Sequence, residues 1–171
     1  DEESRNRVKF YATQARDQAP HYEHTRIGYN YRLSNVCAGI GRGQMLSLPS
    51  FLEKRRGIHE EYRRRLSGVP GLSLLENPDS RYHSNHWLTC VQVNPEEARF
   101  DRETLRLALQ KAGVESRPLW KPMHLQPVFR SCPFYGSGVS DRLFEEGLCL
   151  PSGASLAGED MDRIIDVLLN L

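Results

Sequence analysis

Several patterns that would define a class of protein are missing from these 171 residues. No apolar run is long enough to cross a membrane, and the acidic start Asp-Glu-Glu-Ser is unlike a signal peptide. The four cysteines lie far apart, without the paired spacing of a metal site or of a dense disulfide framework. No internal repeat or low-complexity tract is present. These absences predict a globular cytoplasmic protein with no metal site.

Excess charge of either sign is also missing. The chain has 23 Lys and Arg against 22 Asp and Glu, so its formal net charge is +1. A balanced chain has no general field that attracts nucleic acid or an anionic membrane, and we expect neither as a partner. With 39% hydrophobic residues, the sequence can bury one core, or one small domain plus a piece of another.

A polar, aromatic-rich stretch, Gly-Tyr-Asn-Tyr-Arg-Leu-Ser-Asn, occupies residues 28–35 and ends at side chains able to cap a helix. The helix that follows contains Gly39, Gly41 and Gly43 within its first turns. A glycine inside a helix lowers helix stability by roughly 1 kcal/mol relative to alanine, so a cluster of glycines indicates that another group packs closely against the helix backbone. This packing is either a tight helix-helix contact or a functional contact.

The chain divides into three parts by pattern. Residues 1–33 hold one short helix and a loop, too little for a domain, and they suggest the remnant of a larger domain upstream. Residues 34–67 predict a linking helix with a kink or restart at Pro49. Its arginine-rich face is expected to be solvated, and we place no site there. Residues 68–171 then mix strands and helices.

The third part predicts an α+β domain, with a small, largely antiparallel sheet and helices on one face, preceded by the long kinked helix. Strands are expected at 72–75, 87–93, 114–116 and 148–150. A helix capped by Asp101 should end at Gly113, and Ser140 should cap a short helix that ends at Gly147. The final helix should bury one stripe, Met161, Ile164, Ile165 and Leu168.

A second informative block runs from Arg117 to Phe129 and contains three prolines. Between them stand Trp120, Lys121 and His124, which are poor core material. A loop stiffened by proline that presents cations, an imidazole and an indole suits an anionic, ring-bearing ligand. The alternative is a purely structural loop, in which the indole only covers the core.

Both blocks, in this order, resemble the C-terminal half of the DegT/StrS family of pyridoxal phosphate (PLP) enzymes, the sugar-nucleotide aminotransferases of fold type I. The Trp-Leu-Thr-Cys and Leu-Cys-Leu-Pro-Ser-Gly segments fit the same family, so the resemblance covers nearly the whole chain. The branch that it resembles most aminates UDP-linked 4-keto-6-deoxy-hexosamines, as in bacillosamine-type sugars. The resemblance implies a homodimer that passes an amino group from glutamate to C4 of the keto sugar, for surface polysaccharide or glycan synthesis.

The resemblance also implies roles for particular residues. Asn30 should reach the PLP phosphate of the other subunit, with Arg32 beside it as an anion contact or, alternatively, in an interface salt bridge. The nucleotide-sugar pocket should be faced by His124, Arg117, Trp120 and Lys121, and less directly by Tyr29 and His24.

One departure from the family concerns lysine. The chain has Lys9, Lys54, Lys111 and Lys121, and none stands before a glycine-rich strand, where the family keeps its Schiff-base lysine. We therefore expect the C-terminal portion of an aminotransferase, with no catalytic residue of its own and no activity alone. Two alternatives stay open: a sugar dehydratase of the same family, in which histidine replaces that lysine, and a non-catalytic dimerisation or interaction module.

Overall fold

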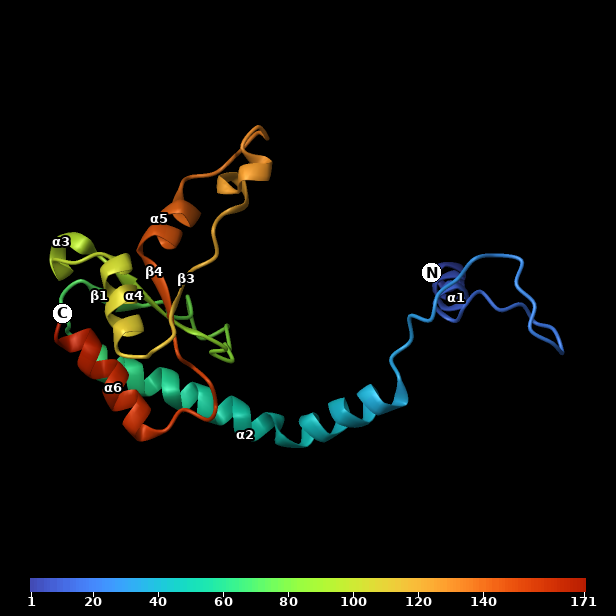
Figure 1. The fold of residues 1–171 in the computed structure, drawn as a ribbon, viewed down its shortest axis with the longest axis horizontal. Helices are drawn as coiled ribbons and strands as arrows, with labels where there is room; N and C mark the ends of the chain where they lie inside the picture. The colour runs from blue at the N-terminus through green and yellow to red at the C-terminus, as the bar shows by residue number, and fades with distance from the viewer. The chain divides into compact units, whose positions relative to one another are not determined.

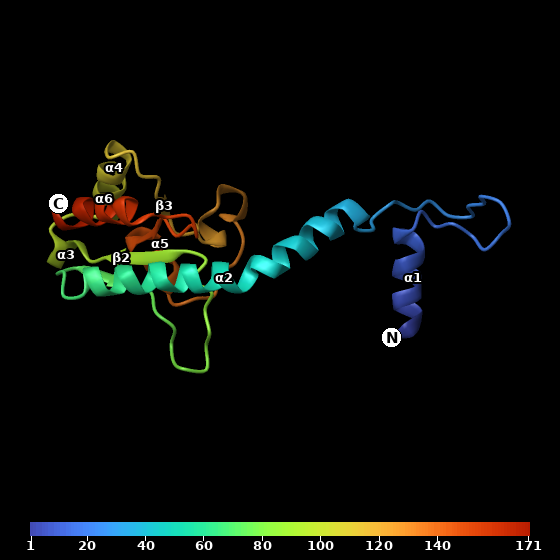
Figure 2. The same ribbon diagram turned by 90° about the horizontal axis from the view of Figure 1, so that it is seen from below.

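A computed structural model describes residues 1–171, which divide into two units, Asp1–Leu48 and Pro49–Leu171. Figures 1 and 2 show the helices and strands along the chain. The elements are α1 (Glu2–Ala12), α2 (Asn35–Leu66), β1 (Leu72–Leu74), β2 (Thr89–Val93), α3 (Pro95–Ala98), α4 (Arg102–Lys111), β3 (Arg117–Pro118), the 3-10 turns Met123–Leu125 and Pro127–Phe129, α5 (Val139–Glu146), β4 (Gly147–Leu150) and α6 (Gly158–Leu169).

The four strands form one sheet of order β1-β2-β4-β3, and every neighbouring pair is antiparallel. The predicted antiparallel sheet is therefore confirmed. The strand expected at 114–116 is wrong, because the paired residues are Arg117 and Pro118. Gly113 has a φ of +73° and reverses the chain after α4, so the Val114 N–H donates back to the carbonyl of Leu109 instead of entering the sheet.

One face of the sheet carries the core of the second unit. Alternation along β2 turns Thr89, Val91 and Val93 to the same side, where all three are buried. Figures 1 and 2 show α4 and α6 beside the sheet. The helices that supply this core are α2, α4 and α6, through Tyr62, Leu66, Leu105, Leu109, Met161, Ile164, Ile165 and Leu168. The stripe predicted for the final helix is thus confirmed.

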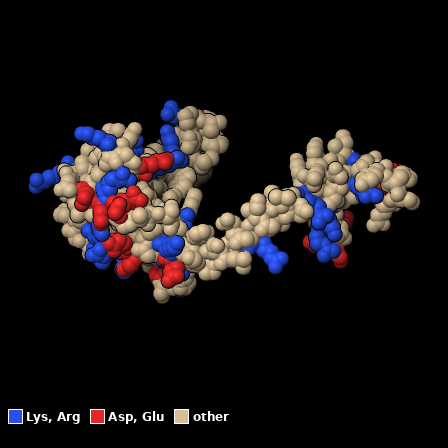
Figure 3. Space-filling model, turned by 60° about the horizontal axis from the view of Figure 1, so that its bottom comes forward, with Lys and Arg blue, Asp and Glu red and all other residues tan.

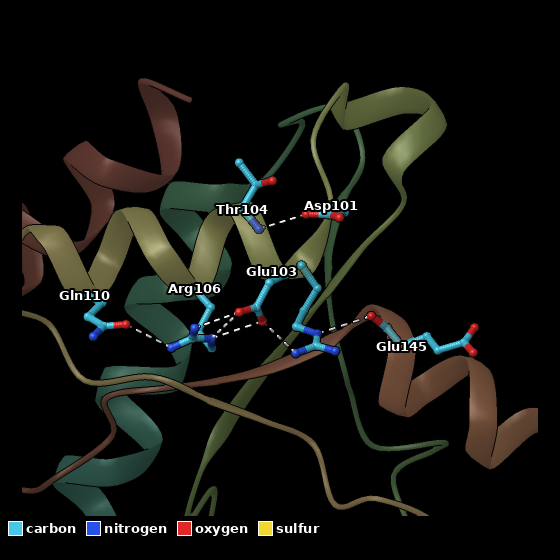
Figure 4. A network of polar contacts seen from close by, with 7 residues as sticks. Asp101, Glu103, Thr104, Arg106, Gln110 and Glu145 are labelled. Carbon is cyan, nitrogen blue, oxygen red and sulfur yellow. Dashed lines mark hydrogen bonds and ion pairs between the residues drawn. The ribbon is translucent and has the colours of Figure 1, made fainter.

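Hydrogen bonds at the ends of α4 and α5 set the positions of both helices. Asp101 caps α4 as predicted, since its Oδ1 accepts from the backbone N–H of Thr104 at 2.7 Å. Arg102 donates to the carbonyl of Glu145 at 3.2 Å, which joins the start of α4 to the end of α5 (Figure 4). Ser140 is not the cap of α5. Gly138 is, because its φ of +76° makes the turn and places Ser140 inside the helix.

The helix α2 starts beside Ser34, whose Oγ accepts from the N–H of Cys37 at 3.2 Å. It contains Pro49 and continues through it. Of the kink or restart that we expected at this proline, the restart does not occur. Its buried residues all belong to the second unit: His59, Tyr62 and Leu66. The three glycines at 39, 41 and 43 have nothing within 4 Å of the place a Cβ would take, so no part of this chain presses on them.

Much of the arginine-rich face of α2 is solvated, as expected. Arg63 and Arg64 form exposed ion pairs with Glu60 and Glu61. The expectation is wrong for Arg55, which is partly buried and hydrogen-bonds to two loops. Figure 3 shows cationic and anionic side chains interspersed on the drawn face of the second unit. No helix has the length and apolar character needed to cross a membrane.

Candidate functional site

The segment after β3 is a loop held by its own hydrogen bonds, and it projects away from the sheet (Figure 1). Pro122 and Pro127 stand at the starts of its two 3-10 turns. The first turn is closed by the Leu125 N–H, which donates to the Pro122 carbonyl at 3.0 Å. Because proline fixes φ and lacks an N–H, the loop is stiff without joining the sheet. Trp120 and Lys121 are consequently exposed.

A cavity of about 630 Å³ lies at the base of this loop. Its walls come from the segment leading into β3, the turn after β4, the first half of α6 and the residues before β2. The indole rings of Trp87 and Trp120 have centroids 6.1 Å apart and planes tilted by 38°. Charged side chains join them in the lining: Glu115, Arg117, Asp160 and Arg163. Flat apolar rings beside charged groups suit a ligand that has both a ring and an anionic group.

Arg117 lines this cavity and pairs with Glu115, Nη2 to Oε1, at 2.5 Å. Both side chains are mostly exposed, 79% and 74%, so solvent screens the pair and it contributes little to stability. The guanidinium therefore keeps donors available for an incoming anion.

The second tryptophan of the cavity, Trp87, is held through its backbone. Nη1 of Arg55 donates to the Trp87 carbonyl at 2.6 Å and to the Ser152 carbonyl at 3.1 Å. The buried Oγ of Ser152 accepts from the Thr89 N–H at 2.8 Å and donates to the Leu150 carbonyl at 2.9 Å. Ser152 thus completes the end of the β2-β4 ladder. The guanidinium of Arg55 fixes the two loops that leave this ladder.

His124 lies apart from the cavity lining, and so does Lys121. The His124 ring stacks on Phe134 with centroids 3.6 Å apart, and its Nε2 is 2.7 Å from Oδ1 of Asp141 in α5. That buried nitrogen has no hydrogen-bond partner, so the contact with Asp141 is a close approach without a hydrogen bond. Of the four residues assigned to the sugar side in this loop, the structure brings Arg117 and Trp120 together.

Two histidines stack next to Trp87. The rings of His59 and His86 have centroids 3.7 Å apart, and Nε2 of buried His59 lies 3.2 Å from Glu76. Burial lowers the pKa of His86, and the nearby charge of His59 lowers it further. Both effects favour the neutral form of His86.

The other predicted residues belong to the first unit. Asn30 forms an isolated antiparallel bridge with Thr13, and the Gln14 N–H donates to the Tyr29 carbonyl at 3.1 Å. Nδ1 of His24 lies 3.0 Å from the Gln14 carbonyl. These bonds bring Tyr29, Asn30 and His24 to the chain that leaves α1.

Close packing of the backbone fixes this arrangement. A Cβ at Gly28 would clash with the backbone of Gln14 and Ala15, so only glycine fits there. The side chains of Asn30 and Arg32 are exposed and make no hydrogen bond or ion pair within the chain. An amide and a guanidinium with free donors are a chemical match for a phosphate or a carboxylate.

Sequence reasoning missed several residues of the cavity, and also Arg55, which hydrogen-bonds to the carbonyls of two lining residues. It assigned Trp87 to a strand, whereas β2 starts at Thr89. It read Arg55 as part of a solvated face, and nothing in the sequence separates that arginine from its neighbours Lys54 and Arg56. Asp160 and Arg163 were passed over because they stand between the core positions of the final helix.

The chain matches one protein-family model and several known proteins. The model of the DegT/DnrJ/EryC1/StrS aminotransferase family matches residues 1–169. The chain is 38% identical over 175 residues to EpsN of Bacillus subtilis (strain 168), which is provisionally named as a pyridoxal phosphate-dependent aminotransferase. That alignment covers 100% of this chain and 44% of EpsN. GDP-perosamine synthase of Vibrio cholerae is 29% identical over 87% of this chain and 40% of its own length.

A solved structure shows the same fold. The aminotransferase TlmJ from Streptoalloteichus hindustanus superposes with a TM-score of 0.83 at 27% identity, covering 99% of this chain and 45% of TlmJ. The chain therefore spans less than half the length of the relatives it matches.

Proposed function

Because the chain belongs to the DegT/DnrJ/EryC1/StrS aminotransferase family, we propose that it forms the C-terminal portion of a PLP-dependent enzyme acting on nucleotide-linked sugars. The enzyme moves an amino group from glutamate to C4 of a 4-keto-6-deoxy sugar. The observation that carries this proposal is the family match over residues 1–169. EpsN supports it because its name gives a pyridoxal phosphate-dependent aminotransferase, and GDP-perosamine synthase supports it because its name gives a nucleotide-linked product.

The finer features of the proposal rest on the two sequence blocks. The acceptor is a UDP-linked sugar of the bacillosamine type, its product serves surface polysaccharide or glycan synthesis, and the enzyme is a cytoplasmic homodimer. The first unit then supplies residues to the partner's site, and the second unit supplies residues for the acceptor sugar.

The residues of the first unit fit the cofactor's phosphate. The exposed amide of Asn30 and the guanidinium of Arg32 have no partner within the chain, so both keep hydrogen-bond donors available. When bound, PLP supplies the electron sink that makes amino transfer feasible. We assign Asn30 and Arg32 to hold and orient it, and Tyr29 and His24, from the same unit, to contact the sugar.

The residues of the second unit suit the acceptor. Trp120 offers an exposed ring for stacking, and Arg117 can exchange Glu115 for an anionic group of the nucleotide. Lys121 adds a flexible cation next to the indole. His124 is held between the Phe134 ring, on which it stacks, and Asp141, which its Nε2 approaches.

No lysine of these 171 residues stands in the family's cofactor-binding context, so we propose that the chain alone does not transaminate. The test is to incubate the chain with PLP and glutamate, reduce with borohydride and map the peptides. We expect no adduct on a single lysine and no glutamate-dependent amination of a keto sugar added to the same mixture. A specific adduct on Lys9, Lys54, Lys111 or Lys121 would overturn this part of the proposal.

The gene product that contains this chain distinguishes the alternatives. A preceding domain with a lysine before Glu-Gly-Gly or Gly-Gly-Gly supports the aminotransferase, and a histidine at that place supports the dehydratase. An unrelated domain, or none, supports a dimerisation or interaction module.

Subunit mixing tests the cross-dimer role of Asn30 in the longer enzyme. Asn30→Ala subunits are mixed with subunits that lack the cofactor lysine, after exchange of subunits has been demonstrated. If each site takes its lysine from one subunit and Asn30 from the other, the mixed dimer has one intact site and activity returns. Absence of recovery would place Asn30 in its own subunit's site or outside any site.

A further inference from the structure

Two cysteines face each other across the middle of the sheet. Cys90 of β2 and Cys149 of β4 are direct partners in the antiparallel register, and their sulfur atoms are 3.8 Å apart. The residues are 59 positions apart in the chain, so only the fold brings them together. Cys149 lines the cavity described above, but neither cysteine has a role in the proposed function.

The backbone shows which kind of pair they form. The Cys90 carbonyl accepts a hydrogen bond from the N–H of Leu75, which continues the chain after β1. The N–H and C=O of one strand residue point to the same side, so the hydrogen bonds of Cys90 are directed toward β1. Cys90 and Cys149 therefore form a non-hydrogen-bonded pair, in which the Cα atoms lie about 4.5 Å apart and the side chains are closest.

This geometry permits a covalent link. A disulfide needs Cα atoms roughly 4.4–6.8 Å apart, and a non-hydrogen-bonded antiparallel pair falls inside that range. The sulfur atoms need only rotate about their Cα–Cβ bonds and approach from 3.8 Å to bonding distance. The strands already hold the correct register, so the backbone does not have to rearrange.

We propose that Cys90 and Cys149 are a reversible oxidation site, which a peroxide converts to a disulfide across β2 and β4. Cys90 is partly exposed, whereas Cys149 is only 6% exposed, so a small oxidant has access to the pair and a bulky one does not.

The reaction balances with one peroxide. The thiolate of one cysteine attacks an oxygen of hydrogen peroxide, the O–O bond breaks, and the departing hydroxide takes up a proton to leave as water. The second sulfur then attacks the sulfenic acid so formed, the S–O bond breaks, an S–S bond forms, and another water leaves. Two thiols lose two electrons in total, and the peroxide is reduced to two waters.

Contact between the thiols favours the first step. The contact between the two sulfur atoms lowers the pKa of Cys149, while the same contact, together with burial, raises the pKa of Cys90. One sulfur of the pair is thus the more acidic, and thiolate is the form that reacts with peroxide.

The other two cysteines provide an internal comparison. Cys37 and Cys132 are exposed, and neither has a sulfur partner. Oxidation of an exposed single thiol proceeds to sulfenic and sulfinic acids or to links between molecules. The proposed site differs because its product is an intramolecular disulfide.

The test uses the full chain with Cys37 and Cys132 replaced by serine, treated with a small excess of hydrogen peroxide and blocked with an alkylating reagent. We expect a mass lower by two hydrogen atoms, a Cys90–Cys149 linked peptide, and restoration by dithiothreitol. Cys149→Ser in the same background should instead gain oxygen on Cys90 or stay unchanged.

The same mapping on the unsubstituted chain keeps the proposal testable if the variants fold poorly. Oxygen addition at Cys90 and Cys149 without a link, or two unreacted thiols under peroxide that oxidises Cys37, would overturn it.

Discussion

Apolar side chains are mostly exposed in residues 1–48, whereas in residues 49–171 they form a buried core. In the second unit, α2, α4 and α6 bury a continuous cluster against the sheet. In the first unit Ala15 is the single buried residue, and α1 has none. The first half of α2 leaves Val36, Ile40 and Leu46 exposed.

The difference shows where the stability of each unit comes from. The second unit has a core of its own, which supplies most of the driving force for folding. The first unit is held by backbone hydrogen bonds around Gly28 and Asn30, and its exposed apolar surface is of the kind that marks an interaction site. This is what we expect of the segment proposed to complete a partner's active site.

The largest expected effect compares two leucines under the same substitution. Leu109 is 0% exposed in α4, and Leu46 is 84% exposed in α2. Leu109→Ala should lower the free energy of unfolding by about 2–5 kcal/mol, because it removes buried contacts and leaves a cavity. Leu46→Ala should change it by less than about 0.5 kcal/mol in the chain alone. Urea unfolding followed by tryptophan fluorescence measures both, and equal losses would contradict the contrast between the units.

The next effect separates the proposed roles of the two units in the longer enzyme. Asn30→Ala removes one charge-assisted hydrogen bond to the phosphate, about 1.5–3 kcal/mol, so PLP retention should fall tenfold or more. His124→Ala should leave PLP bound and raise the KM for the sugar or lower kcat. Dialysis with absorbance and steady-state kinetics distinguish the two. Loss of PLP from both variants, or from neither, would show that the roles are not divided in this way.

A smaller effect is expected at Arg55. Arg55→Met removes the hydrogen bonds to the Trp87 and Ser152 carbonyls, and we expect a loss of about 1 kcal/mol after allowance for partial exposure. The emission of Trp87 should also change as its loop loosens. Arg42→Met, in the exposed first half of α2, is the matched control and should leave both signals unaltered. If the control behaved like Arg55→Met, charge alone would account for the effect.

The smallest effect concerns pH. The folded state lowers the pKa of His86 below its usual 6.5, so below that pH the unfolded chain binds more protons than the folded one. Stability should therefore fall as pH drops through 6.5, and the loss should level off once the pH is below the folded-state pKa. His86→Asn should remove this component and tolerate the φ of +44° at this position. Denaturant midpoints across the acid range measure it; an unchanged slope in the variant would exclude His86 as the source.

Local patterns predicted those parts of the fold that depend on neighbours in sequence. The cap at Asp101 and the stripe containing Ile164 and Ile165 follow from side-chain chemistry and helical period, and both are confirmed. The predicted start of α5 was wrong, because the chain turns at Gly138 and this glycine, not Ser140, is the N-cap.

Features that depend on strand register could not be predicted from the sequence. Nothing local shows that Cys90 stands opposite Cys149, or that Trp87 meets Trp120. The site residues at 30 and 124 came from resemblance to a family, and their roles stay predictions.

Hydrogen exchange of the isolated chain, confirmed as a monomer, tests the contrast between the two units most directly. The account predicts that amides of β2 and α6 exchange only through global unfolding, whereas amides of residues 36–48 exchange faster by orders of magnitude, because that half of α2 packs against nothing in the chain. Equal protection of residues 36–48 and β2 would contradict it, because the first unit would then have a source of stability other than a partner.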